Sequence, residues 1–346
     1  MIELLKTIRI VGLRPILRLY RAYRFVWEGT IDGYYTTRMI QALLNVGFFD
    51  EVQKRGRIDL DTFAKARNLD GTILKALCDS LFSLSVLKKE GSNYSLDSKG
   101  QLLVDVAHGW FEGVYGYEAV VHCLEELLTK EKEYGRDVHR RIRFVTKGYG
   151  EMEKWIYFPL AIDIISRNRF RKVLDLGCGD GTFLRALCER DNELLGYGVD
   201  IAPEAIADGR EKAKQAGLQD RIQLFVEDIS KVRTLPDPLR TIDAAITFFV
   251  LHELLFSGAD AVIELLRGFR TAFPGVPLIV FEVVRPTPEE MRKRPGMAIY
   301  YFLYHDITHQ KPVSGEEWKE LFDKAGFSVI EERRLRFART AIFTIR

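Results

Sequence analysis

The second half of the chain alternates short apolar runs with longer amphipathic stretches. Strands that alternate with helices at this spacing are typical of an α/β fold with a parallel, doubly wound sheet. Each of the first three predicted strands ends in an acidic residue, which places carboxylates at the edge where such sheets bind ligands. The predicted strands cover residues 173–175, 194–200, 222–228, 242–250 and 278–284, and the predicted helices cover 183–190, 202–217 and 260–273.

The first half has a different pattern, with three short helices followed by a hairpin signal. The helices are predicted over 37–49, over 59–68 with Asp59 as its cap, and over 72–84, where apolar residues recur at helical spacing. The residues around Gly91 separate two short strands, 87–90 and 94–96. This order predicts a winged helix. Its third helix offers Lys75 as its only basic residue, too few cations for binding to DNA.

The connection between the halves, residues 101–165, is mainly helical in pattern and rich in aromatic residues. We therefore expect a helical domain over 1–105, a connector over 106–165 and an α/β domain over 166–346. Within this pattern, a glycine-rich loop follows the first strand of the second half, with Gly177, Gly179 and Gly181 at alternate positions. Glycines there let the backbone turn sharply and approach a ligand closely.

The spacing of this loop is GxGxG, which differs from both the GxGxxG of dinucleotide enzymes and the phosphate-binding GxxxxGK[ST] pattern. Asp180, inside the loop, is expected to cap the helix that follows. Asp200 ends the second strand, where a carboxylate suits the two hydroxyls of a ribose. Asp228 ends the third strand and is placed to accept a hydrogen bond from an adenine amino group.

Together these residues resemble a class I S-adenosylmethionine-dependent methyltransferase over roughly residues 150–346. Asp175 with the three glycines matches the first motif of that family, Asp200 its ribose-binding acid and Asp228 its adenine-side acid. The resemblance implies a Rossmann-like seven-stranded sheet, finished by an antiparallel strand pair over 331–346 after a last helix over 314–326. Its implied cofactor is S-adenosylmethionine.

The first half is similar to the winged-helix dimerisation domain of small-molecule O-methyltransferases, which implies a homodimer. In that family the connector supplies substrate contacts and part of the cofactor lid. Two of its aromatic residues lie nearest the sheet: Tyr149, as a candidate for substrate contact, and Tyr157, as a candidate for cofactor contact.

Methyl transfer requires an enzyme to position the acceptor and remove a proton. In O-methyltransferases a His after the fourth strand is the general base, and His252 stands there. A later pair, His305-Asp306, together with His252-Glu253, resembles the 2-oxo acid C3-methyltransferases of nonribosomal-peptide amino acid biosynthesis. That resemblance implies a non-haem iron held by His252, Glu253 and His305, with His305 also at the catalytic centre. His309 could replace Glu253 as a ligand or act as the base.

The predicted reaction is metal-assisted C-methylation of a 2-oxo acid. The alternative is metal-independent O- or N-methylation of a phenolic or other small metabolite, with His252 as the base. Tyr301 and Tyr304 are predicted to line the substrate pocket, and Arg285, in a charged loop over 285–296, could meet a substrate carboxylate. Glu282, at the end of the fifth strand, is a further candidate for the pocket or a structural carboxylate.

The composition narrows the picture further. The formal net charge of +2 gives no global drive toward nucleic acid. The four cysteines show no metal-ligand spacing and indicate reduced thiols in a cytoplasmic protein. No apolar run is long enough to span a bilayer. The first 27 residues hold six Lys or Arg and one acid, which predicts an amphipathic helix that packs on the second subunit or lies at a membrane surface.

Overall fold

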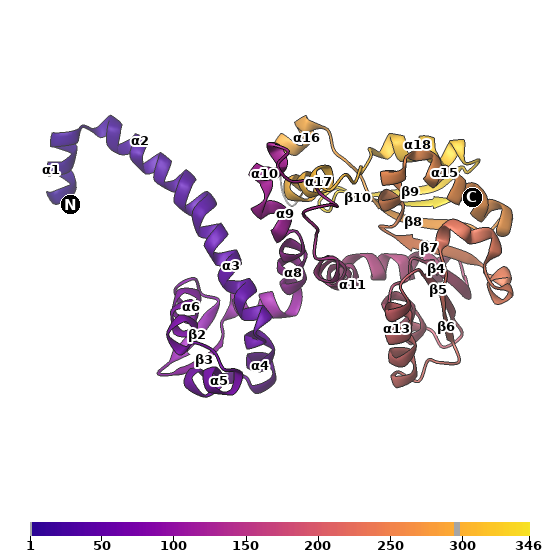
Figure 1. Ribbon diagram of the computed structural model, residues 1–346, viewed down its shortest axis with the longest axis horizontal. Helices are drawn as coiled ribbons and strands as arrows, with labels where there is room; N and C mark the ends of the chain where they lie inside the picture. The colour runs from indigo at the N-terminus through magenta and orange to yellow at the C-terminus, as the bar shows by residue number, and fades with distance from the viewer. Residues whose placement is uncertain (1, 294–297) are drawn as a thin grey trace. The chain divides into compact units, whose positions relative to one another are not determined.

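The computed structural model describes residues 2–293 and 298–346, which form two compact units (Figure 1). The first unit comprises Met1–Glu118 and Arg140–Met152, and the second comprises Ala119–His139 and Glu153–Arg346. The connector expected over 106–165 is thus shared between the two units. The three-domain division stays a prediction.

The first unit is mainly helical and contains a small antiparallel sheet, with strand order β1-β3-β2 among the described residues. Its elements are α1 (Ile2–Val11), α2 (Leu13–Tyr23), the π-helical η1 (Arg24–Ile31), α3 (Asp32–Asn45), α4 (Phe48–Arg55), β1 (Arg57–Asp59), α5 (Leu60–Arg67), α6 (Gly71–Ser83), β2 (Leu87–Glu90), β3 (Asn93–Leu96), α7 (Ser98–Leu102), the π-helical η2 (Leu103–Ala107), α8 (His108–Gly116) and the first part of α11 (Ile142–Arg167).

The predicted order of helices and hairpin is present in this unit. Asp59 caps α5 as expected, because its Oδ1 accepts a hydrogen bond of 2.9 Å from the backbone N–H of Thr62. The helix predicted over 37–49 was wrong in extent. It ends at Asn45, and α4 begins at Phe48, because Gly47 between them adopts φ 74°, outside the helical region. The short strand β1, which pairs with β3, was not predicted.

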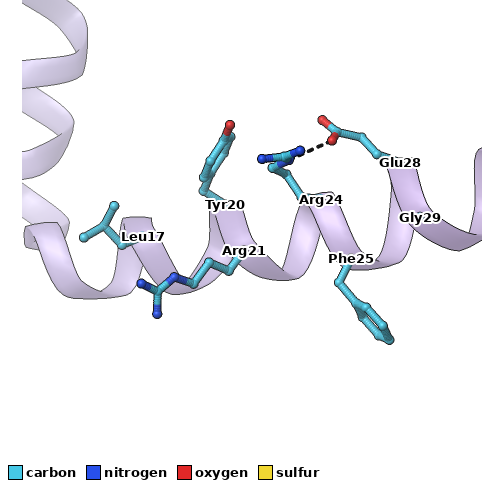
Figure 2. A pocket seen from close by; sticks show the side chains of 7 residues that line it. All are labelled: Leu17, Tyr20, Arg21, Arg24, Phe25, Glu28 and Gly29. Carbon is cyan, nitrogen blue, oxygen red and sulfur yellow. Dashed lines mark hydrogen bonds and ion pairs between the residues drawn. The ribbon is translucent and has the colours of Figure 1, made fainter. Parts of the chain in front are cut away.

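The basic N-terminal segment is helical, as predicted. α2 has no buried residue, and large apolar side chains along it and η1 are open to solvent, such as Leu17 at 47% and Phe25 at 75%. Figure 2 shows Leu17, Tyr20, Arg21, Arg24 and Phe25 along this run, with the Arg24 guanidinium turned toward Glu28, to which its Nε donates over 2.8 Å. None of the described helices is both long and apolar enough to cross a bilayer.

The second unit contains a seven-stranded sheet with order β6-β5-β4-β7-β8-β10-β9 among the described residues. Its strands are β4 (Lys172–Leu176), β5 (Leu195–Asp200), β6 (Ile222–Val226), β7 (Ala244–Phe248), β8 (Leu278–Val283), β9 (Val329–Leu335) and β10 (Thr340–Ile345). Its helices are α9 (Glu118–His122), α10 (Leu124–Leu128), the rest of α11, α12 (Thr182–Arg190), α13 (Pro203–Gln215), η3 (Ile229–Thr234), η4 (Asp237–Thr241), α14 (Leu251–Leu254), η5 (Leu255–Ser257), α15 (Ala259–Ala272), α16 (Pro288–Lys293), α17 (Ala298–Ile307) and α18 (Gly315–Lys324).

The first five strands of this sheet are parallel, and β10 is antiparallel to both β8 and β9. The expected doubly wound sheet with a final antiparallel pair is therefore confirmed. The strand order reverses between β4 and β7, and ligands bind such sheets beyond the carboxyl ends of the strands at this switch point.

The alternation of side chains along the strands builds two hydrophobic layers, one on each face of the sheet. In β8, Leu278 and Val280 join the layer under α15 and α18, whereas Ile279 and Phe281 join the layer under α11, α12 and α13. All six residues of β8 are buried, so this strand lies inside the core. It carries one acidic residue, Glu282, at its carboxyl end.

Candidate active site

The glycine loop connects β4 to α12 at the switch point. Gly177, Gly179 and Gly181 have φ of 82°, 54° and 69°. A Cβ atom at Gly177 would lie 2.6 Å from Cγ2 of Val250, so both the backbone conformation and the space require glycine there. The carboxylate of Asp200 fixes the loop, because its Oδ2 accepts a hydrogen bond of 2.8 Å from the N–H of Gly179. Asp180, which was predicted to cap α12, precedes the N-cap residue Gly181, and its Oδ1 accepts a hydrogen bond of 3.0 Å from the N–H of Thr182, the first residue of the helix.

Asp175, beside the loop, is 2% exposed. Within the described part of the chain its buried Oδ1 has no hydrogen-bond partner. Burial, and then the negative charge of Asp200, raises the pKa of Asp175 to about 8. A carboxyl group in such surroundings is suited to receive a cationic ligand. The structure thus brings together Asp175, the three glycines and Asp200 at the carboxyl ends of β4 and β5.

Asp228 and Tyr157 have protein partners of their own. Hydrogen bonds from the side chain of Ser230, and then from its backbone N–H, which lies 2.9 Å from Oδ1, lower the pKa of Asp228. The hydroxyls of Tyr157 and Thr340 are 2.9 Å apart, and Tyr157 is the donor because Thr340 donates to the carbonyl of Ala338. The cofactor contacts expected of Asp228 and Tyr157 stay predictions.

His252 and Glu282 form a buried pair. Nδ1 of His252 lies 2.9 Å from Oε2 of Glu282, and the backbone N–H of His252 donates to Oε1 over 3.1 Å. The exposed fractions are 4% for His252 and 0% for Glu282. Oε2 also accepts a hydrogen bond from the N–H of Val283 over 3.1 Å, so both oxygens of this buried carboxyl group have partners.

This pairing was not predicted, although Glu282 was considered as a pocket residue. The sequence signal for it is a single carboxylate in the otherwise apolar strand LIVFEV. A buried acid in such a strand needs a donor, and the His that follows the neighbouring strand β7 supplies it.

His305 lies close to His252, with ring centroids 5.3 Å apart. It is 2% exposed, its Nδ1 donates to the carbonyl of Tyr301 over 2.7 Å, and its ring stacks on that of Tyr301 at 3.9 Å. A carbonyl oxygen only accepts, so Nδ1 carries the proton in His305, as it does in His252 beside the carboxylate. In the neutral form of each ring, Nε2 therefore carries the lone pair.

The predicted iron ligands were His252, Glu253 and His305. Strand β7 ends at Phe248, and His252 and Glu253 lie on α14, so neighbouring residues are not forced to opposite faces. Oε1 of Glu253 is 3.9 Å from Nε2 of His252, and its side chain is 43% exposed. Among the residues that the structure describes, no group of three or more His, Cys, Asp or Glu is arranged to hold a metal ion. The structure therefore gives the predicted iron no support.

His309, the other candidate ligand, follows the end of α17. It adopts φ 61°, is exposed, and its ring meets that of Tyr134 edge-on at 6.1 Å. Helical continuation from His305 to His309 does not occur, since α17 ends at Ile307.

The predicted substrate residues lie in three places. Tyr301 and Tyr304 lie on α17 with His305, and Tyr304 is 7% exposed. Tyr149 belongs to the first unit, where its ring packs against Gly113. Arg285 forms an ion pair with Asp306 at 2.5 Å. The loop expected over 285–296 contains α16, and its residues 294–296 lie outside the described residues. The substrate roles stay predictions.

Comparison with known proteins decides the family. A family model described as a methyltransferase domain matches residues 122–332, more than half of the chain. The chain belongs to this methyltransferase family. A solved structure, that of the mitomycin 7-O-methyltransferase MmcR, has the same fold, with a TM-score of 0.68 and 17% identity over 95% of this chain and 99% of that one.

Two curated methyltransferases are similar in sequence. A 2-ketoarginine methyltransferase of Streptomyces arginensis is 27% identical over 310 residues, 88% of each chain. An indolepyruvate C-methyltransferase of Streptomyces griseus is 26% identical over 169 residues, 47% of this chain and 48% of that one.

The protein is therefore an S-adenosylmethionine-dependent methyltransferase, and its site fits that cofactor. The cofactor carries a sulfonium and an ammonium group, and the buried Oδ1 of Asp175, which has no partner among the described residues, can accept a hydrogen bond from the ammonium group. The glycine loop leaves the backbone open to close approach, and Asp200 stands at the next strand end. When bound, the cofactor supplies a methyl group activated by the positive sulfur.

Proposed function

We propose that the enzyme methylates the carbon next to the carbonyl group of a small 2-oxo acid. The observation that carries the proposal is the likeness to a 2-ketoarginine methyltransferase over 88% of both chains. The shorter likeness to an indolepyruvate C-methyltransferase supports the same substrate class, since both names describe 2-oxo acids.

The geometry supplies the base that this reaction needs. A C–H bond beside a carbonyl must lose its proton before the carbon can attack the methyl group. Nε2 of His252 carries the lone pair, because Nδ1 is engaged with Glu282. When Nε2 takes the proton, the carboxylate of Glu282 stabilises the imidazolium ion that forms. The C–H electron pair becomes the enolate, which forms the new C–C bond as the sulfur–methyl bond breaks and the sulfur becomes neutral.

The burial of the histidine site strengthens the electrostatic interactions among its side chains. His252, Glu282 and His305 are each less than 5% exposed, so charge interactions among them are weakly screened by water. The reaction is therefore written with the chain's own side chains, since the predicted iron has no support among the described residues.

The test is a methyl-transfer assay with S-[methyl-¹³C]adenosylmethionine. The acceptors are 2-oxo acids with guanidino, indole, phenyl and branched aliphatic tails, beside phenols and amines. We expect ¹³C NMR to show the label on the carbon next to the carbonyl of a 2-oxo acid. Label on oxygen or nitrogen instead would contradict the proposal and support O- or N-methylation with the same base.

A half-reaction isolates the base. In D₂O with S-adenosylhomocysteine bound, the wild-type enzyme is expected to exchange the C3 proton of its 2-oxo acid, and His252→Asn is expected to lose this exchange. Exchange at the wild-type rate in the variant would remove His252 from the role.

We also propose that the chain forms a homodimer through α1, α2 and η1. These helices expose Leu17, Tyr20, Tyr23 and Phe25, and single soluble chains rarely leave so many apolar side chains along one helical run. A second copy that packs its own helices against them would bury these side chains.

A further inference from the structure

The charge of Asp175 acts on a second carboxyl group, which was not predicted from the sequence. Glu153 lies on α11 in the same compact unit, and the two carboxyl groups repel each other. A third acid, Asp200, repels Asp175 in turn. Among the described residues, the charge that acts on the buried carboxyl group of Asp175 is therefore negative.

The register of α11 directs Glu153 toward the edge of the sheet. Glu153 and Tyr157 are four residues apart and share one face of the helix. The ring of Tyr157 packs on those of Phe249 and Phe281, at 4.9 and 6.1 Å, near the carboxyl ends of β7 and β8. Glu153 lies one turn closer to the start of the helix. On β4, Asp175 shares a face with Val173, which packs in the same hydrophobic layer as Tyr157, so Asp175 is on the side of the sheet that α11 covers.

We propose that Glu153 is a binding residue for the amino-acid end of S-adenosylmethionine, where it and Asp175 together receive the ammonium group. Asp175 has a buried Oδ1 atom that lacks a donor among the described residues, and an ammonium group has three N–H donors to share between two carboxylates. Charge-assisted hydrogen bonds of this kind are the strongest available to a ligand amine.

The electrostatics agree with this assignment. Burial first, and repulsion by Asp175 second, raises the pKa of Glu153 to about 8. The hydroxyl of Tyr157, the third titratable group beside this pair, is held by Thr340 and has its pKa raised to about 12, so it stays neutral. Ammonium binding favours both carboxylates, so the ligand displaces protons from the pair when it binds near neutral pH.

A comparison of two ligands distinguishes ammonium binding by Glu153 from a general effect of the substitution on the site. S-adenosylhomocysteine carries the ammonium group but no sulfonium charge, whereas 5′-methylthioadenosine keeps the adenosine and lacks the amino-acid end. Isothermal titration calorimetry with both ligands compares wild type with Glu153→Gln, which removes one negative charge at constant size. Glu189→Gln, on the exposed surface of α12, is the matched control.

We expect Glu153→Gln to weaken S-adenosylhomocysteine binding about tenfold, the loss of one charge-assisted hydrogen bond, and to leave 5′-methylthioadenosine unchanged. The control should match wild type with both ligands. An equal loss with both ligands, or no loss with S-adenosylhomocysteine, would overturn the proposal.

Proton release provides a readout that needs no variant. Titrations of wild type at pH 7 in buffers of different ionisation enthalpy should show net proton release with S-adenosylhomocysteine and none with 5′-methylthioadenosine. Equal release with both ligands, or none with either, counts against the pair. If Glu153→Gln fails to fold, Glu153→Asp, which keeps the charge but shortens the side chain, takes its place in the same two titrations, and an unchanged affinity for S-adenosylhomocysteine would overturn the proposal.

Discussion

Arg285 donates two hydrogen bonds to the carboxylate of Asp306, from Nη2 to Oδ1 over 2.5 Å and from Nη1 to Oδ2 over 3.2 Å. Its Nε donates to the carbonyl of Pro312 over 2.9 Å, and its guanidinium lies 5.0 Å from the ring of Phe302. These contacts join the segment after β8, which carries Glu282, to α17, which carries His305. Arg285 therefore holds the two halves of the histidine site in register.

This relationship predicts the effect of Arg285→Lys and Asp306→Asn. Lysine keeps the charge but cannot make the two-pronged contact, so each change should lower kcat by roughly 10- to 100-fold, as misplacement of a catalytic group does. The double variant should be no worse than either single variant, because both remove the same contact. Steady-state kinetics of the four proteins provides the measurement.

The sequence-based hypothesis that Arg285 binds a substrate carboxylate gives a different pattern. Arg285→Lys would then raise KM with kcat unchanged, and Asp306→Asn would have little effect. Thermal unfolding should change little in any of these variants, since the pair is 30% and 55% exposed and exposed ion pairs contribute weakly to stability.

The buried pair predicts strong effects on turnover. His252→Asn removes the base and should lower kcat by about 10²- to 10⁴-fold, the usual contribution of a positioned base. Glu282→Gln should also lower kcat, because an amide supports the imidazolium ion less than a carboxylate does. Calorimetry should show that both variants bind S-adenosylhomocysteine with an affinity close to that of wild type. Full turnover by Glu282→Gln would show that the carboxylate is structural.

The pKa shifts of Asp175 and Glu153 predict a pH-dependent gain of stability on ligand binding. Both folded pKa values are raised to about 8, above their unfolded values, so the ligand-free native state binds more protons than the unfolded chain between about pH 4 and 8. Its stability therefore falls as pH rises through this window.

Bound S-adenosylhomocysteine removes this loss, because its ammonium group stabilises the carboxylates. The increase in Tm at a saturating ligand concentration should therefore grow from pH 6 to pH 8.5, as measured by differential scanning fluorimetry. Asp175→Asn should flatten most of this trend. An increase in Tm that is the same at every pH in wild type would contradict the assignment.

The homodimer is tested on the exposed N-terminal helices. Leu17→Asp combined with Phe25→Asp places charges on the apolar run and should convert a dimer into a monomer, as seen by sedimentation velocity. Arg24→Asp would disturb the local pair with Glu28 and serves as a control for a charge change on the same helices. A wild-type chain that sediments as a monomer at micromolar concentration would contradict the proposal.

The sequence predicted the sheet well, because the spacing of apolar residues and the acidic residues at the strand ends both indicate it. The glycines at 177, 179 and 181 and the acids at 175 and 200 lie where the pattern placed them, since each is tied to the end of a strand. The capping box of Ser314 and Glu317 likewise marks the start of α18 within one residue of the prediction.

The sequence patterns did not predict contacts between distant segments. Glu282 and His252 meet because β7 and β8 are neighbours, and the sequence alone does not state which donor a buried acid will find. Glu153 sits on a long helix of mixed polarity, where one acid among several has no pattern to mark it. Gly47 ended a helix that periodicity would have continued, through its backbone conformation alone.

The position of Glu282 at the end of a wholly buried strand has a consequence for how this enzyme can change. A substitution near the carboxylate disturbs packing on both faces of the sheet, so the chemistry is tied to the survival of the fold. The helix α17, by contrast, is fastened to the segment after that strand by a partly exposed ion pair. We therefore expect substitutions along α17 to be tolerated more readily in descendants of this enzyme than substitutions at His252 and Glu282.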